Sequence, residues 1–580
     1  YSASASEIVT GALRDDDRGR RDLAGLPTFT IDPDTARDFD DAISVAREGG
    51  GYRAHVHIAD VSYFVDAGGA LDREARERTA SVYLPLWAEP MLPPALSSDL
   101  CSLRPRTVRK CVTVELTFDA RGRRTSARFY RSLIRSDHRL TYGVVDRVLG
   151  ERGGAVALLT GEEGDADAAA PASAEPPAVA VASPAVATPP FAGASAGAGT
   201  PLAVVPEATA EPDAALVEQL SLAAELAAVL RRRRFARGAL RIGSFEPEYA
   251  FDRGGRLSGA AARPETASHA LVEEFMLAAN EAVADFLVRR RAKAVFRVHE
   301  PPDPQSAAGL FAQLEELGVP LAALPEGVLS SGQLGAAYAR AAAAIAATSA
   351  REGRGHFAWP TLLLRSLKQA VYAPANRGHF GLATPAYLHF TSPIRRYPDL
   401  VVHRALLHEL GEAGAPPGDE ELAAIAEACS LAERAIARVE LDADDVALTF
   451  LLDRRLLEQG WQTTFTGEVT GVVPGGLFVR FGGCHEGYLP ARALGAERFA
   501  LSEHETALVG QTSGRRYRLG DAVEVRVERL DRVRGRVDLV PGREESGRRA
   551  AAQGRVPLRR TSGGRPPRRR APGHGPRRRG

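Results

Sequence analysis

The stretch TFTIDPDTARDFDDAIS, residues 28–44, holds the side chains of this chain that are best suited to chemistry. Within ten residues it carries five aspartates: Asp32, Asp34, Asp38, Asp40 and Asp41. Crowded carboxylates disfavour one another's ionised forms, so a fold tolerates such a group when a cation neutralises it. A ligand set made only of oxygen atoms favours Mg²⁺, with Mn²⁺ as the alternative, over zinc. The residue types therefore predict a metal site.

The residues on either side of the aspartates indicate which elements position them. Residues 29–31 and 43–45 are largely apolar β-formers, which predicts a bend between two buried strands. The competing interpretation is a solvated acidic loop, but the apolar flanks and the stiff entry at Pro33 weigh against it. An EF-hand loop is excluded, because its Gly at position six and Glu at position twelve are not in register here.

The same stretch closely resembles the signature of the RNase II/RNase R family of RNB-domain exoribonucleases, which reads I-D-P and then D-x-D-D-A. Asp32, Asp38, Asp40 and Asp41 occupy its four acidic positions. The resemblance implies that these four hold the metal and that Asp40 takes part in catalysis. Asp34 lies outside the signature and is expected to be solvated.

A second motif, HFTSPIRRYPDL at residues 389–400, places two arginines after a Ser-Pro turn and before a predicted helix. A guanidinium binds phosphate through two donors and stays charged at any working pH. The alternative is a solvated helix start. The motif matches the family, which implies a catalytic role for Arg395 and substrate binding by Arg396. Glu440 matches a third, catalytic position of the family, although Leu441 replaces the arginine that follows it there.

Three further positions are implied to bind substrate. Tyr83, which packing alone could explain, matches a tyrosine that stacks on the terminal base. Tyr142 and Glu273 match residues that recognise ribose. The family often has a second clamping aromatic where Ile242 stands, with Phe245 nearby. Four arginines at 231–234 fit either an exposed helix end or the RNA entry path, and the sequence favours neither.

From Gln462 the chain reads as about five short strands with Gly-rich turns, which predicts a small barrel. It resembles the RNA-binding OB-fold of the S1 type. Phe465, Phe478 and Tyr488 are predicted to be surface aromatics on which bases stack, although an aromatic in a strand more often belongs to a core.

The predicted fold class is α+β: a mixed catalytic domain of RNB type, a C-terminal S1-type OB-fold barrel and a disordered basic tail. The predicted parts are a lead-in at 1–27, the catalytic domain at 28–452 with a low-complexity insertion at 153–212, the barrel at 462–541 and the Arg-rich tail at 542–580. The cold-shock barrels that usually precede the catalytic domain in this family are not visible in the sequence.

Charge is distributed unevenly over the 580 residues. Residues 543–580 contain 13 Arg and two Glu, a local charge of +11, whereas the whole chain carries +1 and the remainder therefore −10. A basic tail indicates a polyanionic partner. The four cysteines show neither metal spacing nor a disulfide framework, and no apolar run is long enough for a bilayer, so we expect a cytoplasmic monomer without membrane contact.

Taken together, the resemblance implies a hydrolytic, processive 3′→5′ exoribonuclease that degrades single-stranded RNA to nucleoside 5′-monophosphates with Mg²⁺. One alternative is a non-catalytic RNA-binding or regulatory protein on the same scaffold, which loss of an acid at Asp38, Asp40 or Asp41 would have indicated. A second is a metal-dependent phosphodiesterase for a small nucleotide, which would need neither the barrel nor the tail.

Overall fold

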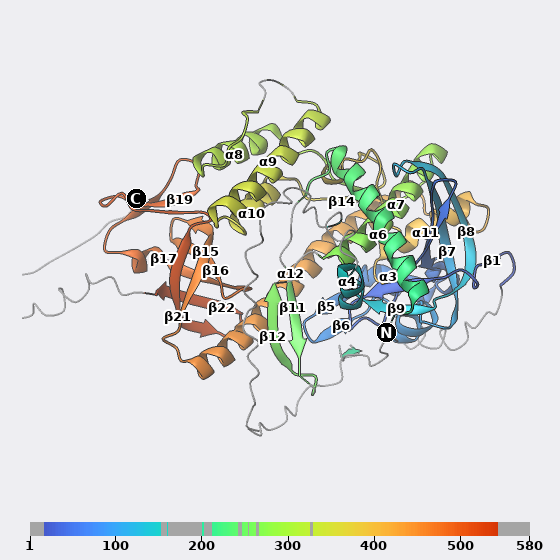
Figure 1. The fold of residues 1–580 in the computed structure, drawn as a ribbon, viewed down its shortest axis with the longest axis horizontal. Coiled ribbons are helices and arrows are strands. Elements are labelled where there is room, and N and C mark those ends of the chain that lie inside the picture. Colours follow the sequence, from blue (N-terminus) through green and yellow to red (C-terminus); the bar gives the residue numbers. More distant parts are fainter. Residues whose placement is uncertain are drawn as a thin grey trace, which may run out of the picture.

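A computed structural model of the chain shows a large mixed body beside a small barrel (Figure 1). The structure describes residues 17–151, 159, 200–201, 212–241, 246–252, 254–262, 266–324, 327 and 329–542. Almost all of the predicted insertion, the tail from residue 543, Ile242 and Phe245 lie outside the described residues.

A seven-stranded mixed sheet forms the framework of the body, with the order β1-β8-β7-β4-β3-β2-β9. Its strands are β1 (Arg21–Asp22), β2 (Phe29–Asp32), β3 (Asp41–Glu48), β4 (Gly51–Ala59), β7 (Val108–Phe118), β8 (Arg124–Arg135) and β9 (His138–Thr141). The four long strands β3, β4, β7 and β8 pair antiparallel, whereas β2 pairs parallel with β9. This arrangement places the acid-bearing strands β2 and β3 next to each other.

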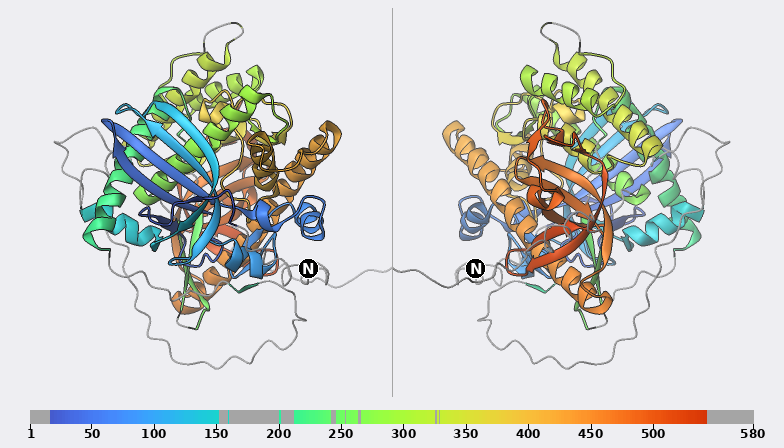
Figure 2. Two further views of the ribbon diagram at one scale, coloured as in Figure 1. Left: turned by 90° about the vertical axis from the view of Figure 1, so that its right-hand side faces the viewer. Right: turned by 90° about the vertical axis from the view of Figure 1, so that its left-hand side faces the viewer.

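Helices pack on both faces of the sheet, and parts of its long strands are seen uncovered in the left view of Figure 2. Apolar side chains of α4 (Tyr142–Glu151), α6 (Ala214–Ala236) and α7 (Ala267–Arg290) pack on one face. On the other face lie α2 (Val61–Phe64), α3 (Ala70–Arg78) and η1 (Leu96–Leu100), whereas α11 (Tyr397–Glu409) contributes to both apolar clusters. Burial of apolar surface on both sides stabilises the sheet and fixes the positions at which its strands end.

Further elements complete the structure outside the seven-stranded sheet and the barrel. They are β5 (Val82–Leu84), β6 (Trp87–Glu89), β10 (Thr200–Pro201), β11 (Pro247–Phe251), β12 (Leu257–Ala262), β13 (Phe296–Val298), α8 (Pro304–Glu316), α9 (Ser331–Glu352), α10 (Ala358–Ser366), β14 (Val371–Ala373), η2 (Phe380–Leu382) and α12 (Asp419–Gln459). The helix α12 has 41 residues and runs from the body to the barrel without a break (Figure 1). None of the helices in the described parts of the chain has the length and apolar character needed to cross a membrane.

The predicted barrel is confirmed as a closed five-stranded barrel. Its strands are β15 (Thr464–Val473), β16 (Gly476–Phe481), β17 (His485–Pro490), β21 (Ala522–Asp531) and β22 (Arg536–Pro541). Between β17 and β21 lie α13 (Ala491–Leu494), β18 (Phe499–Leu501), β19 (Ala507–Gly510) and β20 (Arg516–Arg518). The predicted α+β class with a C-terminal barrel is therefore correct.

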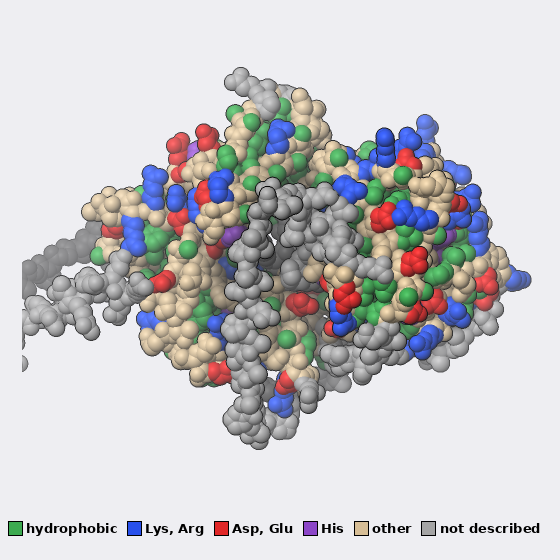
Figure 3. Space-filling view, in the orientation of Figure 1, with side chains coloured by type: hydrophobic (Ala, Val, Ile, Leu, Met, Phe, Trp, Pro, Cys, Tyr) green, Lys and Arg blue, Asp and Glu red, His purple; other side chains and the backbone are tan. Residues whose placement is uncertain are grey.

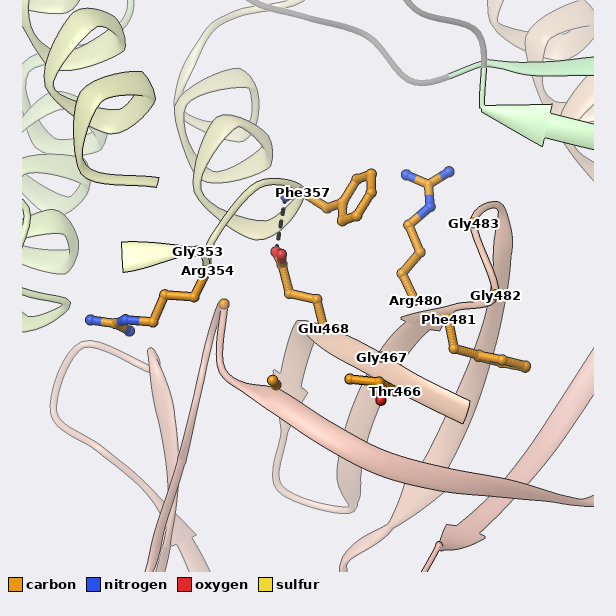
Figure 4. Close-up of a pocket in the computed structure, with 12 residues that line it drawn as sticks. Gly353, Arg354, Phe357, Thr466, Gly467, Glu468, Arg480, Phe481, Gly482 and Gly483 are labelled. Atoms are coloured by element: carbon orange, nitrogen blue, oxygen red, sulfur yellow. Dashed lines mark hydrogen bonds between the residues drawn. The ribbon is translucent and has the colours of Figure 1, made fainter. Parts of the chain in front are cut away.

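A carboxylate of the barrel joins it to the body (Figure 4). Glu468 on β15 accepts hydrogen bonds from the backbone N–H groups of His356, Phe357 and Ala358 at 2.9–3.0 Å. These groups begin α10, where unpaired N–H groups and the helix dipole favour an anion. Beside the contact lies a cavity of about 210 Å³, in which the guanidinium of Arg480 lies over the ring of Phe357. The barrel is thus attached to α10 as well as to α12.

Candidate active site

The aspartates lie at the connection between two neighbouring strands, as the sequence predicts. The strand β2 ends at Asp32, β3 begins at Asp41, and the loop 33–40 joins them. Asp32 and Asp40 are 9% and 4% exposed, whereas Asp34 is exposed. The predicted bend between buried strands and the predicted solvation of Asp34 are both confirmed.

Burial raises the pKa values of three of these acids, Asp32, Asp40 and Asp41, and repulsion from neighbouring acids adds to the rise at Asp32 and Asp40. Burial is the main cause that holds the pKa of Asp32 well above its usual range, and the charge of Asp41 adds to it. Burial likewise raises the pKa of Asp40, with smaller contributions from Asp38 and Asp41. The pKa of Asp41 rises to about 6 because of burial, against which the two arginines Arg395 and Arg396 act. The four acids therefore belong to one electrostatic site.

Two features of the acids fit a divalent cation. Oδ2 of Asp32 and Oδ2 of Asp40 are buried and have no hydrogen-bond partner among the described residues. The donor set consists only of carboxylate oxygen atoms, which suits Mg²⁺ or Mn²⁺. Within the described parts of the chain, no three His, Cys, Asp or Glu side chains converge into a ready-made ion site. Mg²⁺ is commonly held by one or two carboxylates together with water and substrate phosphate, so an open carboxylate set is compatible with it.

The turn before α11 brings two arginines to the acids. The N–H of Ile394 donates to Oδ1 of Asp40 at 2.9 Å, and Nε of Arg395 lies 3.7 Å from Oδ2 of the same carboxylate. Arg396 instead donates from Nη2 to Asp399 at 2.7 Å. Arg395 is therefore the arginine that faces the acids, and Arg396 is held in place by a buried partner.

Tyr83 and Glu440 form one side of the site. The hydroxyl of Tyr83 donates to Oδ2 of Asp38 at 2.6 Å, and the ring is 37% exposed. The backbone N–H of Tyr83 donates to Oε1 of Glu440 on α12 at 2.9 Å. Burial raises the pKa of Glu440. Glu440 thus reaches the acids through Tyr83, as a positioning group.

Tyr142 is the first residue of α4, and Glu273 lies on α7. The ring of Tyr142 stacks on His269 with centroids 4.0 Å apart, and Glu273 follows His269 one helical turn later. Glu273 Oε2 lies 3.1 Å from Nη2 of Arg234 and 3.6 Å from Nη1 of Arg231. Tyr142 is therefore held against α7 at His269, whereas Glu273 pairs with two arginines of α6.

The four arginines at residues 231–234 do not share one environment, although the sequence suggested one common role, either an exposed helix end or the RNA entry path. Arg231 and Arg234 are buried and pair with glutamates of α7, whereas Arg232 and Arg233 are exposed. The spacing of three residues places the buried pair on one face of α6. Half of the run is therefore structural.

The barrel aromatics do not all lie on the surface. Phe478 and Tyr488 pair across β16 and β17 with ring centroids 5.4 Å apart, and Phe478 is 38% exposed. Phe465 is only 6% exposed and packs against Phe481 in the barrel core. The prediction that Phe465 is a surface aromatic is wrong, because its side chain points to the inward face of β15.

Sequence reasoning missed three residues that shape the site. Asp399 is fully buried and accepts hydrogen bonds from the N–H of Ser392 and from Arg396. Its place in the second motif was a usable signal. Arg139 on β9 and Ser102 contact the backbone of the acidic loop. A single arginine in a strand and a serine in a turn carry no chemical pattern, so nothing in the sequence pointed to them.

Comparison with family models matches the described architecture. The model of the RNB domain covers residues 20–412, and that of the S1 RNA binding domain covers residues 462–540. Ribonuclease R of Escherichia coli (strain K12) is 34% identical over 534 residues, which is 90% of this chain and 57% of that protein. Ribonuclease R of Thermotoga maritima is 33% identical over 92% of this chain and 67% of its own length. The chain thus spans just over half of the E. coli relative.

Solved structures give the same assignment. Mycoplasma genitalium RNase R in complex with ribose-methylated single-stranded RNA superposes with a TM-score of 0.74 and 25% identity, covering 92% of this chain and 75% of that one. The yeast pseudonuclease Ssd1 shares the fold, with a TM-score of 0.58, 18% identity and coverage of 84% of this chain and 52% of its own. With an RNB domain over residues 20–412 followed by an S1 domain, this chain belongs to the RNB family, in which its relatives include ribonuclease R.

Proposed function

We propose that this chain is a hydrolytic, processive 3′→5′ exoribonuclease that acts on single-stranded RNA and releases nucleoside 5′-monophosphates with Mg²⁺, or with Mn²⁺ in its place. The observation that carries the proposal is the geometry at Asp40. Its carboxylate is buried, its Oδ2 has no hydrogen-bond partner among the described residues, and that atom lies 3.7 Å from Nε of Arg395. The chain also keeps all four acids of the signature, Asp32, Asp38, Asp40 and Asp41.

The four acids would hold the cation, which when bound supplies an activated water and neutralises phosphate charge. Arg395 is placed to donate to the phosphate whose charge grows in the transition state. Its Nη2 is held by the hydroxyl of Ser392 at 3.1 Å, which limits the positions of the guanidinium. Arg396 would contribute positive charge near the acids while its side chain stays hydrogen-bonded to Asp399.

Tyr83 would end the RNA channel by stacking on the terminal base. Its hydroxyl and its backbone are both held, by Asp38 and by Glu440, so the ring has a fixed orientation next to the acids. An aromatic face accepts any base, which suits an enzyme without sequence preference. The 3′-terminal nucleotide would then present its phosphodiester to Asp40 and Arg395.

Ribose would be recognised by Tyr142, whose ring stacks on His269 of α7, and by Glu273, which lies one turn further along the same helix. The 2′-hydroxyl can both donate and accept a hydrogen bond, so a carboxylate and a phenol are suitable partners. On the barrel, the exposed Phe478 and the half-buried Tyr488 would stack on bases upstream of the cleaved end.

The alternative of a non-catalytic RNA-binding protein has a physical basis, because the fold also occurs in a pseudonuclease. The intact acid set and the contact between Arg395 and Asp40 favour catalysis. A phosphodiesterase for small nucleotides is less consistent with the closed barrel that is attached to the body.

The proposal is tested with one RNA labelled at either end, with the DNA strand of the same sequence and with a duplex carrying a 3′ single-stranded tail. With Mg²⁺, we expect label at the 3′ end to appear at once as mononucleotide, and label at the 5′ end to appear in a short limit product. The DNA strand should stay intact, and EDTA should stop the reaction. Release of label from the 5′ end first, or RNA binding without hydrolysis, would contradict the proposal.

A further inference from the structure

The loop 33–40 has no regular secondary structure, yet it must hold acids that repel one another. Its conformation therefore has to be set by contacts from outside. Of the loop's own backbone hydrogen bonds, the N–H of Ala36 donates to the carbonyl oxygen of Pro33 at 3.0 Å. Such a turn alone does not fix the direction of the loop, so the remaining contacts decide where the carboxylates lie.

Arg139 supplies the main contacts at the beginning of the loop. It lies on β9, which pairs parallel with β2, and its side chain is buried. Nη2 donates to the carbonyl oxygen atoms of Pro33 and Asp34 at 2.8 and 3.1 Å. The guanidinium also lies over the ring of Phe39, with its carbon atom 5.4 Å from the centroid. One side chain thus connects the beginning of the loop with its end.

Ser102 holds the other end of the loop. Its Oγ accepts a hydrogen bond from the N–H of Phe39 at 3.0 Å and donates to the carbonyl oxygen of Arg37 at 2.8 Å. The N–H of Leu103 donates to the carbonyl oxygen of Phe39 at 3.0 Å. The turn at residues 101–103 therefore acts as the second support of the loop.

The choice of partners by Arg139 matters for the site. Both of its hydrogen bonds end on backbone carbonyl oxygen atoms, although Asp32 is close enough for the charge of Arg139 to oppose the rise of its pKa. Asp32 consequently keeps Oδ2 free of hydrogen bonds among the described residues. The positive charge of Arg139 thus stabilises the acidic loop, while its hydrogen bonds leave the carboxylates of the loop free to bind a ligand.

We propose that Arg139, together with Ser102, is a positioning residue that holds the acidic loop by its backbone so that the carboxylates of Asp32 and Asp40 stay available for a ligand. The effect on hydrolysis rests on the proposed function, whereas the effect on the loop does not. Arg139 itself does not touch the reacting atoms in this account.

The first measurement is hydrogen exchange of the peptide that spans residues 29–41, without added metal. Arg139→Met removes both hydrogen bonds, and Arg139→Lys keeps the charge but not the planar donor group. We expect both variants to exchange about tenfold faster or more in this peptide, which corresponds to the loss of a hydrogen bond from a charged group. Exchange as slow as in the wild type for Arg139→Met, or full rescue by Arg139→Lys, would overturn the positioning role.

The matched control is Arg20→Met. Arg20 lies directly before β1 and also has a buried side chain, and its Nη1 donates to the carbonyl oxygen atoms of Cys111 and Ser132. In Arg20→Met, the acidic partner Asp60 still has a second arginine, since Nε of Arg131 lies 3.1 Å from its Oδ2. This variant should leave exchange in 29–41 unchanged. If Arg139→Met does not fold, Ser102→Ala tests the other support of the loop. It should accelerate hydrogen exchange at the N–H of Phe39, which loses its acceptor. Exchange at Phe39 as slow as in the wild type would contradict the proposal.

The second measurement separates catalysis from binding. In single-turnover reactions with Mg²⁺, Arg139→Met should lower the hydrolysis rate by about tenfold or more, while its dissociation constant for RNA stays within about twofold of the wild type. An equal loss in Arg20→Met would show a general structural effect and overturn the proposal. A wild-type protein without any hydrolysis would contradict the proposed function and leave the exchange result as the test of Arg139.

Discussion

At the scale of single residues, position relative to the strand ends decides what each aspartate can do. Asp32 closes β2 and Asp40 directly precedes β3, so both are buried against the sheet, whereas Asp34 lies on the outer side of the loop. Sequence spacing alone made the five acids look equivalent. The family signature separated them, and burial gives the physical reason for that separation.

Tyr83 makes a prediction that separates its ring from its hydroxyl. Tyr83→Ala should lengthen the limit product by a nucleotide or more, because base stacking contributes about 1–3 kcal/mol. Tyr83→Phe loses the hydrogen bond to Asp38 but keeps the ring, so its limit product should match the wild type. A sequencing gel of 5′-labelled products measures both. Identical ladders for all three proteins would show that another residue ends the channel.

His57 predicts how stability depends on pH. It is fully buried between Ser44 and Thr113, and burial, followed by the charge of His55, lowers its pKa to about 3. The unfolded chain therefore binds more protons than the native protein from about pH 6.5 downward, and acid removes stability. Between about pH 7.5 and about pH 5 this histidine should account for a loss of about 2 kcal/mol in the free energy of unfolding.

Urea unfolding at several pH values measures this contribution. His57→Gln should lose about 2 kcal/mol less than the wild type over the same interval, whatever its stability at neutral pH. The exposed His356, replaced by Gln, is the surface control. Acids with raised pKa values, such as Asp41, make the native protein more stable as the pH falls and so oppose the effect of His57. The diagnostic quantity is therefore the difference in pH slope between His57→Gln and the wild type. Equal pH slopes in His57→Gln and the wild type would contradict the assignment.

At the scale of elements, the sequence predicted which segments form strands, but it did not predict which side chains of a strand point inward. Apolar flanks correctly predicted β2 and β3, and Gly-rich turns correctly predicted the barrel strands. Phe465 was misplaced because alternation in a strand shows two faces without showing which one is inside. The supports Arg139 and Ser102 could not be predicted, since they act on backbone atoms that lie far away in the sequence.

The contact between β15 and α10 predicts a role for Glu468. Glu468→Ala removes the acceptor of three N–H groups at a helix start, which should destabilise the attachment of the barrel by about 1–3 kcal/mol. Hydrogen exchange at residues 355–360 should accelerate, and affinity should fall for long RNA more than for a tetranucleotide. Glu528→Ala, an exposed position on β21, is the control. An unchanged exchange pattern would show that α12 alone holds the barrel.

At the scale of the whole molecule, positive charge is split between the body and the tail. Lys and Arg side chains gather over the side of the molecule that contains β7, β8 and β1 (Figure 3), and Arg121, Arg123, Arg128 and Arg135 are exposed there. The tail carries 13 further arginines from residue 543 onward. Both regions can attract a polyanion over the distance set by ionic screening.

Removing residues 543–580 should therefore weaken RNA binding and flatten its salt dependence without abolishing it. Each lost phosphate contact on a single strand changes the slope of log K against log salt by about 0.7. The hydrolysis rate at saturating RNA should stay as in the wild type. Filter binding across a series of salt concentrations measures the slope, and an unchanged slope would show that the tail does not contact RNA.

The central claim is that the buried acids, and Asp40 above all, perform the chemistry. Asp40→Asn keeps the size of the side chain and the oxygen atom that accepts the N–H of Ile394, so the fold should survive. One negative charge is lost where the cation would bind, and an interaction realised in the transition state disappears. The matched control is Asp34→Asn in the same loop, at an exposed position.

The decisive measurement is single-turnover decay of RNA, with filter binding on the same samples. For Asp40→Asn we expect hydrolysis to fall by several orders of magnitude while the dissociation constant for RNA stays near that of the wild type. Asp34→Asn should match the wild type in both. Near-normal turnover by Asp40→Asn, or an equal loss in Asp34→Asn, would contradict the assignment of the acidic loop as the catalytic site.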